Sequence, residues 1–292
     1  MGQSLSDRTI VLFALLLVSI LPAQAEVKGD QVTLCTEITA LPALINTSGI
    51  HCLKKDLTHA GTTGIAIDVR RPNVTIDLNG FTITGGLGAA TQSTGIHSLN
   101  RRNVTIRNGT LRGFLVGIFI DGTASFNLLI ENVHLDQVRG AAVRIDQASQ
   151  TVFQNNQITN AGGTPGEFDN NVAVALNQTK NTTISNNLIN GVGANFGATG
   201  IQVNASELTE VRDNSVLNVV GGNTGFSIIA VGSNNTTIHG NRVLNSTNTG
   251  NFGILGSGGT EIYCVNNLVS SNRQIAQPLS GCTFASGNIV PP

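Results

Sequence analysis

Large aromatic residues and charged residues are scarce in this chain. Trp is absent, Tyr occurs once, at Tyr263, and charged residues make up 11% of the 292 positions. Because sugar rings stack on large aromatic side chains, the sequence offers few such platforms. The 16 Lys and Arg residues form no basic block, and the formal net charge is −1. Nucleic acid is therefore not expected as a partner, since phosphate binding requires clustered cations.

Long apolar runs are also missing, except for one at the start. Arg8 precedes the apolar run Ile10–Ile20, and Leu21–Ala25 then supplies small residues in an A-x-A arrangement. This order predicts a secretory signal peptide over residues 1–25, which leaves 292 − 25 = 267 residues. An uncleaved anchor is the alternative, but the run is shorter than the roughly twenty residues that cross a bilayer. We expect a secreted or periplasmic protein with no membrane span after cleavage.

The remaining composition favours an ordered all-β protein. The 34 Gly residues and the many Asn, Thr and Ser residues are typical of turns, and they are also found in disordered, low-complexity chains. A hydrophobic content of 40%, rich in Ile, Val and Leu, argues against disorder. Many turns combined with many β-branched residues indicate short strands.

Internal repetition is the strongest signal in the sequence. Segments such as Asn73–Ile83, Asn103–Leu111 and Asn181–Ile189 share an apolar anchor, and most anchors are followed five positions later by a second apolar residue. Successive anchors are 23 to 31 residues apart: Ile76, Ile106, Ile130, Phe153, Ile184, Val211, Ile238 and Ile262. A short alternating strand, such as Gly64–Asp68, precedes each anchor. A unit of about 25 residues with three short strands buries its apolar face only by stacking on its neighbours.

An asparagine falls two or three residues after most anchors. These residues are Asn79, Asn108, Asn132, Asn156, Asn187, Asn214 and Asn241. A tight bend between strands needs left-handed backbone, which Asn and Gly tolerate best. Stacked amide side chains also bond along an internal ladder. We therefore predict a structural role for these asparagines.

The repeats resemble the right-handed parallel β-helix superfamily typified by pectate lyases, polygalacturonases and alginate epimerases. They are most similar to secreted bacterial β-helix repeat proteins, which carry rungs like Val74–Ile83, and Cys35–Leu53 is similar to the N-terminal cap of that group. The resemblance implies a single-stranded, right-handed parallel β-helix of about eight coils with three parallel sheets. Its expected parts are an N-terminal cap at 26–64, repeats at 65–263 and a C-terminal cap at 264–292.

The four cysteines lie in two pairs near the expected ends of the solenoid. In an exported protein an even count favours disulfides, and three pairings are possible. Because each pair sits where an exposed core needs closing, we predict Cys35–Cys52 and Cys264–Cys282. Each closes a loop of about seventeen residues and contributes on the order of 3 kcal/mol. A metal site that includes His51 is the alternative, but no second close ligand pair accompanies it.

In this superfamily, substrates lie along the outer face of the first parallel sheet. Alternation of inward and outward residues predicts one outward column, which runs Ala66, His97, Phe119, Arg144, Ala175, Gln202, Ile229 and Leu255. It predicts a second, which runs Asp68, Leu99, Asp121, Asp146, Asn177, Asn204, Val231 and Ser257. The polar residues of coils two to six then share one strip: His97, Asp121, Arg144, Asp146, Asn177, Gln202 and Asn204.

The strip suggests carbohydrate chemistry. Asp121 and Asp146 are expected about 5 Å apart on neighbouring rungs, where two carboxylates share a proton, bind a cation such as Ca²⁺, or pair with Arg144. We predict catalytic roles for these three residues and substrate binding by His97, Asn177, Gln202 and Asn204. A solvated sheet face that simply needs polar residues is the alternative interpretation.

Two hypotheses for function follow. The first is an exported protein that binds a polysaccharide and acts on it as a lyase, hydrolase or epimerase. The second is a non-catalytic surface or matrix protein that adheres through a rigid rod; a monomer is expected in either case. The Asp-Pro-His-Asp run of alginate epimerases and the Gly-His-Gly of polygalacturonases are both absent, which favours the second hypothesis. Turnover on a panel of polysaccharides distinguishes the two.

Overall fold

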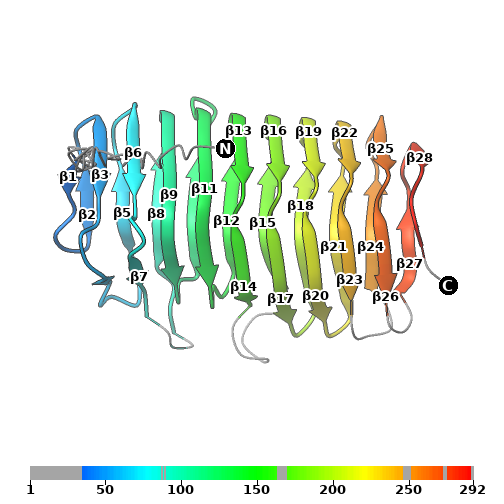
Figure 1. The fold of residues 1–292 in the computed structure, drawn as a ribbon, viewed down its shortest axis with the longest axis horizontal. Helices are drawn as coiled ribbons and strands as arrows, with labels where there is room; N and C mark the ends of the chain where they lie inside the picture. The colour runs from blue at the N-terminus through cyan, green and yellow to red at the C-terminus, as the bar shows by residue number, and fades with distance from the viewer. Residues whose placement is uncertain are drawn as a thin grey trace, which may run out of the picture. The chain divides into compact units, whose positions relative to one another are not determined.

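The computed structural model describes residues 35–86, 88, 90–162, 170–245, 251–271 and 275–290. The chain divides into a unit at Met1–Thr33 and a compact unit at Leu34–Pro292, and every described residue belongs to the second. The predicted signal peptide therefore lies outside the described residues. All regular elements in the described part are strands (Figure 1), and no apolar helix long enough to span a membrane occurs there.

The strands stack in three parallel series, as the sequence predicts. Within the described residues, sheet 1 has ten strands: β2 (Ala43–Ile45), β5 (Ile65–Val69), β8 (Thr94–Leu99), β10 (Val116–Asp121), β12 (Ala141–Asp146), β15 (Asn170–Asn177), β18 (Gly197–Asn204), β21 (Thr224–Val231), β24 (Asn251–Ser257) and β27 (Ile275–Ser280). Sheet 2 comprises β1 (Thr36–Glu37), β3 (Gly49–Cys52), β6 (Val74–Asp77), β9 (Arg102–Arg112), β11 (Phe126–Asp136), β13 (Ser149–Gln154), β16 (Lys180–Ser185), β19 (Glu207–Arg212), β22 (Asn234–His239), β25 (Ile262–Val265) and β28 (Phe284–Ser286). Sheet 3 comprises β4 (Leu57–Thr58), β7 (Thr82–Thr84), β14 (Gln157–Ala161), β17 (Leu188–Ala194), β20 (Ser215–Gly221), β23 (Arg242–Asn245) and β26 (Leu268–Ser271), together with the second halves of β9 and β11.

Each coil contributes one strand to each sheet in turn. Counted by their sheet 1 strands, the eight coils begin at β5, β8, β10, β12, β15, β18, β21 and β24, and we number them 1 to 8. Strands β1–β4 precede coil 1, and β27 and β28 follow coil 8 (Figure 1). In coils 2 and 3 a single eleven-residue strand, β9 or β11, passes through the bend between sheets 2 and 3, which joins these two sheets into one.

The core is a column of stacked aliphatic side chains. The predicted anchors are fully buried, and those from Ile76 to Ile238 pair rung to rung, as in Ile76 with Ile106 and Ile106 with Ile130. The last predicted anchor is wrong, because Ile262 pairs with Thr236 and Cys264 pairs with Ile238. Each residue on one rung therefore covers the apolar surface of the same position on the next. This packing explains why the sequence repeats with one anchor per coil.

The bends between sheets 2 and 3 confirm the structural role predicted for the asparagines, but they show two different roles. Asn79, Asn108 and Asn132 have φ values of 50°, 60° and 54°, in the left-handed region. From coil 4 onward the left-handed residue comes one position earlier than the predicted asparagine, as at Asn155 and Asn186, with φ of 55° and 56°. The predicted asparagine that follows it is then free to point into the core.

These inward asparagines form a continuous amide ladder, which we define as Asn156, Asn187, Asn214, Asn241, Asn267 and Asn288. In each step the side-chain Nδ2 donates to Oδ1 of the next rung, at 2.9 to 3.1 Å. At Asn214, Oδ1 also accepts from the backbone N–H of Asn187 at 3.0 Å, and Nδ2 donates to the carbonyl of Ile184 at 3.0 Å. Such buried amides are stable because these four hydrogen bonds satisfy them.

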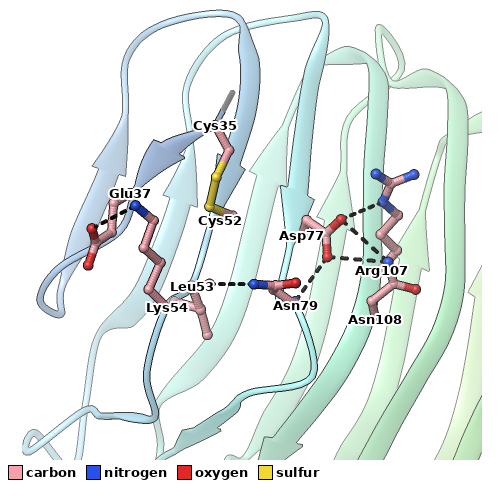
Figure 2. Close-up of a disulfide and its surroundings, with 9 residues drawn as sticks. All are labelled: Cys35, Glu37, Cys52, Leu53, Lys54, Asp77, Asn79, Arg107 and Asn108. Carbon is pink, nitrogen blue, oxygen red and sulfur yellow. Dashed lines mark hydrogen bonds and ion pairs between the residues drawn. A yellow bond between two sulfur atoms is a disulfide. The ribbon is translucent and has the colours of Figure 1, made fainter. Parts of the chain in front are cut away.

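Both predicted disulfides are present. Cys35 is bonded to Cys52, with their Cα atoms 5.8 Å apart, and Cys264 is bonded to Cys282 at the other end. Figure 2 shows the first bond beside β3. It also shows Asp77 accepting from Arg107 Nε at 2.9 Å and from the backbone N–H of Asn79 at 2.9 Å. Side chains on neighbouring rungs are therefore linked outside the core as well as within it.

Candidate functional site

The outer face of sheet 1 carries a row of side chains that are mostly polar. The register pairs Asp68 with His97, His97 with Phe119, and Phe119 with Arg144 on successive rungs. Arg144 pairs in turn with Ala175, and Ala175 with Gln202. We define the sheet 1 strip as these outward positions together with the neighbouring Arg70, Asp121, Asp146, Asn177 and Asn204.

At the N-terminal end of the strip, a carboxylate holds an imidazole and a guanidinium. Asp68 Oδ1 lies 3.3 Å from His97 Nδ1, and Asp68 Oδ2 accepts from Arg70 Nε at 2.8 Å. The His97 ring lies against Phe119, with ring centroids 5.4 Å apart and planes tilted by 40°. The orientation of His97 is therefore set by a carboxylate on one neighbouring rung and an aromatic ring on the other.

In the middle of the strip, Arg144 is held between an aromatic ring and a carboxylate. Its guanidinium carbon lies 5.2 Å from the Phe119 ring centroid, a cation–π arrangement. Arg144 Nε and Nη2 contact Asp146 Oδ2 at 2.8 and 2.6 Å. Two asparagines extend this series of contacts: Asn177 Nδ2 donates to Asp146 Oδ1 at 2.7 Å, and Asn204 Nδ2 donates to Asn177 Oδ1 at 3.3 Å.

The charges of the strip largely offset one another. The hydrogen bond with Asp146 raises the pKa of Arg144, and the negative charges of Asp146 and Asp121 act in the same direction, while partial burial opposes them. Arg144 therefore stays cationic across the physiological pH range. Its side chain is 49% exposed, whereas that of Asp146 is 13% exposed, so the guanidinium is the more accessible partner.

Asp121 lies on the rung next to Asp146, as predicted, since Ile120 pairs with Ile145. Of the three outcomes considered for two adjacent carboxylates, the structure shows the pairing of Asp146 with Arg144. The Asp121 carboxylate itself has no hydrogen-bond or ion-pair partner in the described part of the chain, although its charge acts on Arg144. Asp121 is thus the carboxylate of the strip that is free to meet a ligand.

The predicted position of Ala66 is wrong. Ala66 was expected to face outward beside His97, but it is fully buried, and Asp68 takes that place. The cause is an irregular step in the strand: the second and third residues of β5, β8, β10 and β12 are both buried. Strict alternation fails across such a step, so outward residues before it are misassigned. Ile65, expected inward, is partly exposed for the same reason.

Three participants in the strip were not identified as site residues from the sequence. Asp68 and Arg70 were missed because the shifted register hid the contact with His97, and Phe119 was assigned outward without a role. With the correct register, the sequence would have placed an aromatic residue at an outward position of sheet 1, between a His and an Arg on the neighbouring rungs. That arrangement would have identified Phe119 as a site residue. Residues 163–169, between β14 and β15, lie outside the described part of the chain.

One cavity lies near the N-terminal end, and none of its lining residues belongs to the sheet 1 strip. Its volume is about 340 Å³, and Ile38, Leu44, Asn46 and His51 are among the residues that line it. In the residues that the structure describes, no three His, Cys, Asp or Glu side chains are grouped so that they would hold a metal ion. Involvement of Ca²⁺ stays a prediction.

Comparison with known proteins supports the architecture. A family described as "right handed beta helix region" matches residues 43–243 and 94–289. No curated protein sequence matches the chain.

Several solved structures share the fold at low sequence identity. The tailspike protein 2 enzymatically active domain of bacteriophage CBA120 superimposes with a TM-score of 0.54 and 17% identity, over 85% of this chain and 42% of that one. A double mutant of the periplasmic alginate epimerase AlgG gives 0.51 and 12%, over 82% and 70%. A tailspike mutant of E. coli bacteriophage HK620, in complex with a pentasaccharide, gives 0.55 and 12%, over 83% and 57%. The chain therefore spans less than two thirds of either tailspike structure.

Proposed function

Because this chain belongs to the right-handed β-helix family, we propose that it binds a polysaccharide along the sheet 1 strip. The observation that carries the proposal is the unbroken series of side-chain contacts from Arg70 to Asn204, which crosses six coils on one face. The solved structures named above include an alginate epimerase and a tailspike bound to a pentasaccharide, which is consistent with a carbohydrate ligand.

The strip has the chemistry that sugars need. The Phe119 ring, packed between His97 and Arg144, offers an apolar edge to the C–H groups of a pyranose, and the remaining N–H groups of Arg144 offer donors to hydroxyl or ring oxygens. Asn177, Gln202 and Asn204 supply amide donors and acceptors farther along. Rungs about 4.8 Å apart are close to the length of one sugar residue, so a glycan parallel to the solenoid axis meets one rung per sugar.

We keep Asp121, Arg144 and Asp146 as the predicted catalytic residues, with different roles. Asp121 is the candidate for proton transfer because its carboxylate has no partner in the described residues. Both oxygens of Asp146 accept hydrogen bonds, from Arg144 and Asn177, which suits a positioning residue better than an acid or base. A lyase, hydrolase or epimerase reaction is compatible with this set.

A non-catalytic surface or matrix protein is the second candidate. The observation that favours it is the same pairing: Asp146 and Asp68 are engaged by arginines, which leaves one free carboxylate instead of an acid/base pair. In that case the strip binds glycan without turnover.

We further propose that the protein is exported and acts as a monomer. Two disulfides are compatible with an oxidising compartment outside the cytoplasm. Mass spectrometry of the protein recovered from a secretion-competent host tests cleavage after Ala25, and light scattering tests the monomer.

A polysaccharide panel, assayed with and without Ca²⁺, tests the function. Binding is measured by isothermal titration calorimetry, and turnover by reducing ends and by the absorbance of unsaturated lyase products. We expect Arg144→Ala to weaken binding at least about tenfold, because it removes the exposed donor and its contact with Phe119. Thr183→Ala, on the outer face of sheet 2, is the matched control and should bind as wild type does.

Asp121→Asn then separates the two candidates. In an enzyme this variant loses turnover and retains binding, whereas a non-catalytic protein shows no turnover before or after the substitution. Unchanged binding by Arg144→Ala contradicts the assignment of the strip.

A further inference from the structure

The loops that join sheet 1 to sheet 2 in coils 1 and 2 bring together four arginines. Residues 70–73 read Arg-Arg-Pro-Asn, and residues 100–103 read Asn-Arg-Arg-Asn. Val69 pairs with Ser98 before these loops and Val74 pairs with Val104 after them, so the loops lie on adjacent rungs, about 4.8 Å apart. We define the arginine corner as Arg70, Arg71, Arg101 and Arg102.

Most of this positive charge is uncompensated. Arg70 pairs with Asp68. Arg71 Nε donates to the carbonyl of Asn46 at 3.0 Å and Arg101 Nη1 to that of Asn100 at 3.1 Å, so their partners are neutral. In the described residues no carboxylate forms an ion pair with Arg71, Arg101 or Arg102, and Arg71 and Arg102 are exposed.

The same corner in later coils has a different charge. Coil 3 has Asp121 at the position equivalent to Arg70 and no charged residue between Gly122 and Asn127. In coil 5 the corner holds Lys180, which pairs with Glu207 of coil 6 at 2.9 Å. In coil 8 the corner carries Glu261 instead. Unpaired positive charge is therefore concentrated at coils 1 and 2, beside the N-terminal end of the strip.

We infer that the arginine corner binds an oxyanion, a carboxylate or phosphate, carried by the glycan that lies on the strip. A guanidinium presents a planar fork of N–H groups that matches such oxyanions with two parallel hydrogen bonds. Arg70 belongs to both regions, since it holds Asp68, which in turn holds His97. Because both arginines of the strip, Arg70 and Arg144, are already paired with carboxylates, the corner supplies the unpaired cations that recognise a negatively charged ligand. This inference rests on the proposed function.

Matched glycans that differ only in charge test the inference. Polygalacturonate is compared with its methyl ester, and a phosphomannan with unphosphorylated mannan, by calorimetry on the full chain. In wild type we expect the anionic member of at least one pair to bind more tightly, with an affinity that falls as salt rises. The double variant Arg71→Gln/Arg102→Gln should lose that advantage, about tenfold, and should bind the neutral member unchanged.

Two controls complete the experiment. Arg242→Gln removes an exposed arginine of β23 and should leave both affinities unchanged, and all variants should melt as wild type does. Equal affinity of wild type for charged and neutral members overturns the inference but not the proposed function. Binding to phosphatidylglycerol vesicles in preference to every glycan also overturns it. Failure of wild type to bind any glycan overturns the proposed function and the inference together.

Discussion

Coils 1–3 and coils 4–8 have different side chains at the bend between sheets 2 and 3. Three positions after the anchor, coils 2 and 3 have Gly109 and Val133. Coils 4–8 have an asparagine of the amide ladder at the equivalent position, starting at Asn156. The two regions meet directly, because Asn156 Oδ1 accepts the backbone N–H of Val133 at 2.9 Å.

A second inward column changes character at the same boundary. The residue two positions before the anchor in sheet 2 is Val74, Val104 or Leu128 in coils 1–3. In coils 4–7 it is threonine throughout: Thr151, Thr182, Thr209 and Thr236. All four threonines are buried, and their hydroxyls have no hydrogen-bond partner within the described residues.

The difference shows that this solenoid is stabilised in two ways. Coils 1–3 depend on apolar packing, whereas coils 4–8 combine apolar packing with a buried chain of amides that links every rung to the next. A buried polar network is favourable only while every member is satisfied. The C-terminal coils should therefore respond much more strongly to the loss of one side chain.

The largest expected effect comes from truncating the same position in each region. Asn214→Ala leaves the backbone N–H of Asn187 and the carbonyl of Ile184 without partners inside the core. We expect a loss of about 4 kcal/mol in the free energy of unfolding. Val133→Ala removes only two methyl groups and should cost about 2 kcal/mol. Urea denaturation of both variants measures the difference, and equal losses would contradict a special role for the ladder.

A smaller effect is expected from exchanging Val and Thr between the two regions. Thr209→Val replaces a buried, unpartnered hydroxyl with a methyl group and should stabilise the protein by about 1 kcal/mol. Val104→Thr introduces a hydroxyl among apolar neighbours of coils 1–3 and should cost about 1.5 kcal/mol. Thermal melting of the two variants checks the signs. Destabilisation by Thr209→Val would show that the threonine column is satisfied through contacts along the stack.

The smallest expected effect concerns the bend between sheets 1 and 2, which both regions share. Leu208 occupies the left-handed region there with a φ of 54°, where the equivalent residue of coil 5, Asn181, has 53°. Leu208 is 46% exposed, so Leu208→Asn should gain about 0.5 to 1 kcal/mol through reduced backbone strain and little lost burial. The reverse change, Asn181→Leu, should lose a similar amount. If neither variant shifts the melting temperature, the left-handed backbone conformation at this bend does not reduce the stability of the protein.

The fold was predictable from the sequence because every coil has the same structural requirements. Every coil needs an inward anchor and a left-handed residue at the bend, so Ile and Asn recur in step and reveal the period. The two kinds of asparagine were not separable by pattern alone. Asn132 and Asn156 both follow an anchor closely, but the backbone conformation of the preceding residue decides which one turns and which one enters the core.

The candidate site was predictable only in part. Arg144, Asp146 and Asn177 follow the irregular step in their strands, and their contacts agree with the predicted columns. Asp68 was correctly expected to face outward, but it was placed beside Leu99 because β5 was aligned two residues out of register; it pairs with His97. The arginine corner was invisible for another reason: its two Arg-Arg pairs are about thirty residues apart in the sequence and become neighbours only when coils stack. A chain without a basic block can therefore still carry a basic surface.

The amide ladder has a consequence for how such a molecule lengthens. Asn187, Asn214 and Asn241 are each 27 residues apart, and every one presents the same donors and acceptors to the rung before and the rung after. An in-frame duplication or deletion of 27 residues in this region rejoins the ladder with no donor or acceptor left over. As far as the ladder is concerned, the number of coils in this region can therefore change without any change to the two capped ends.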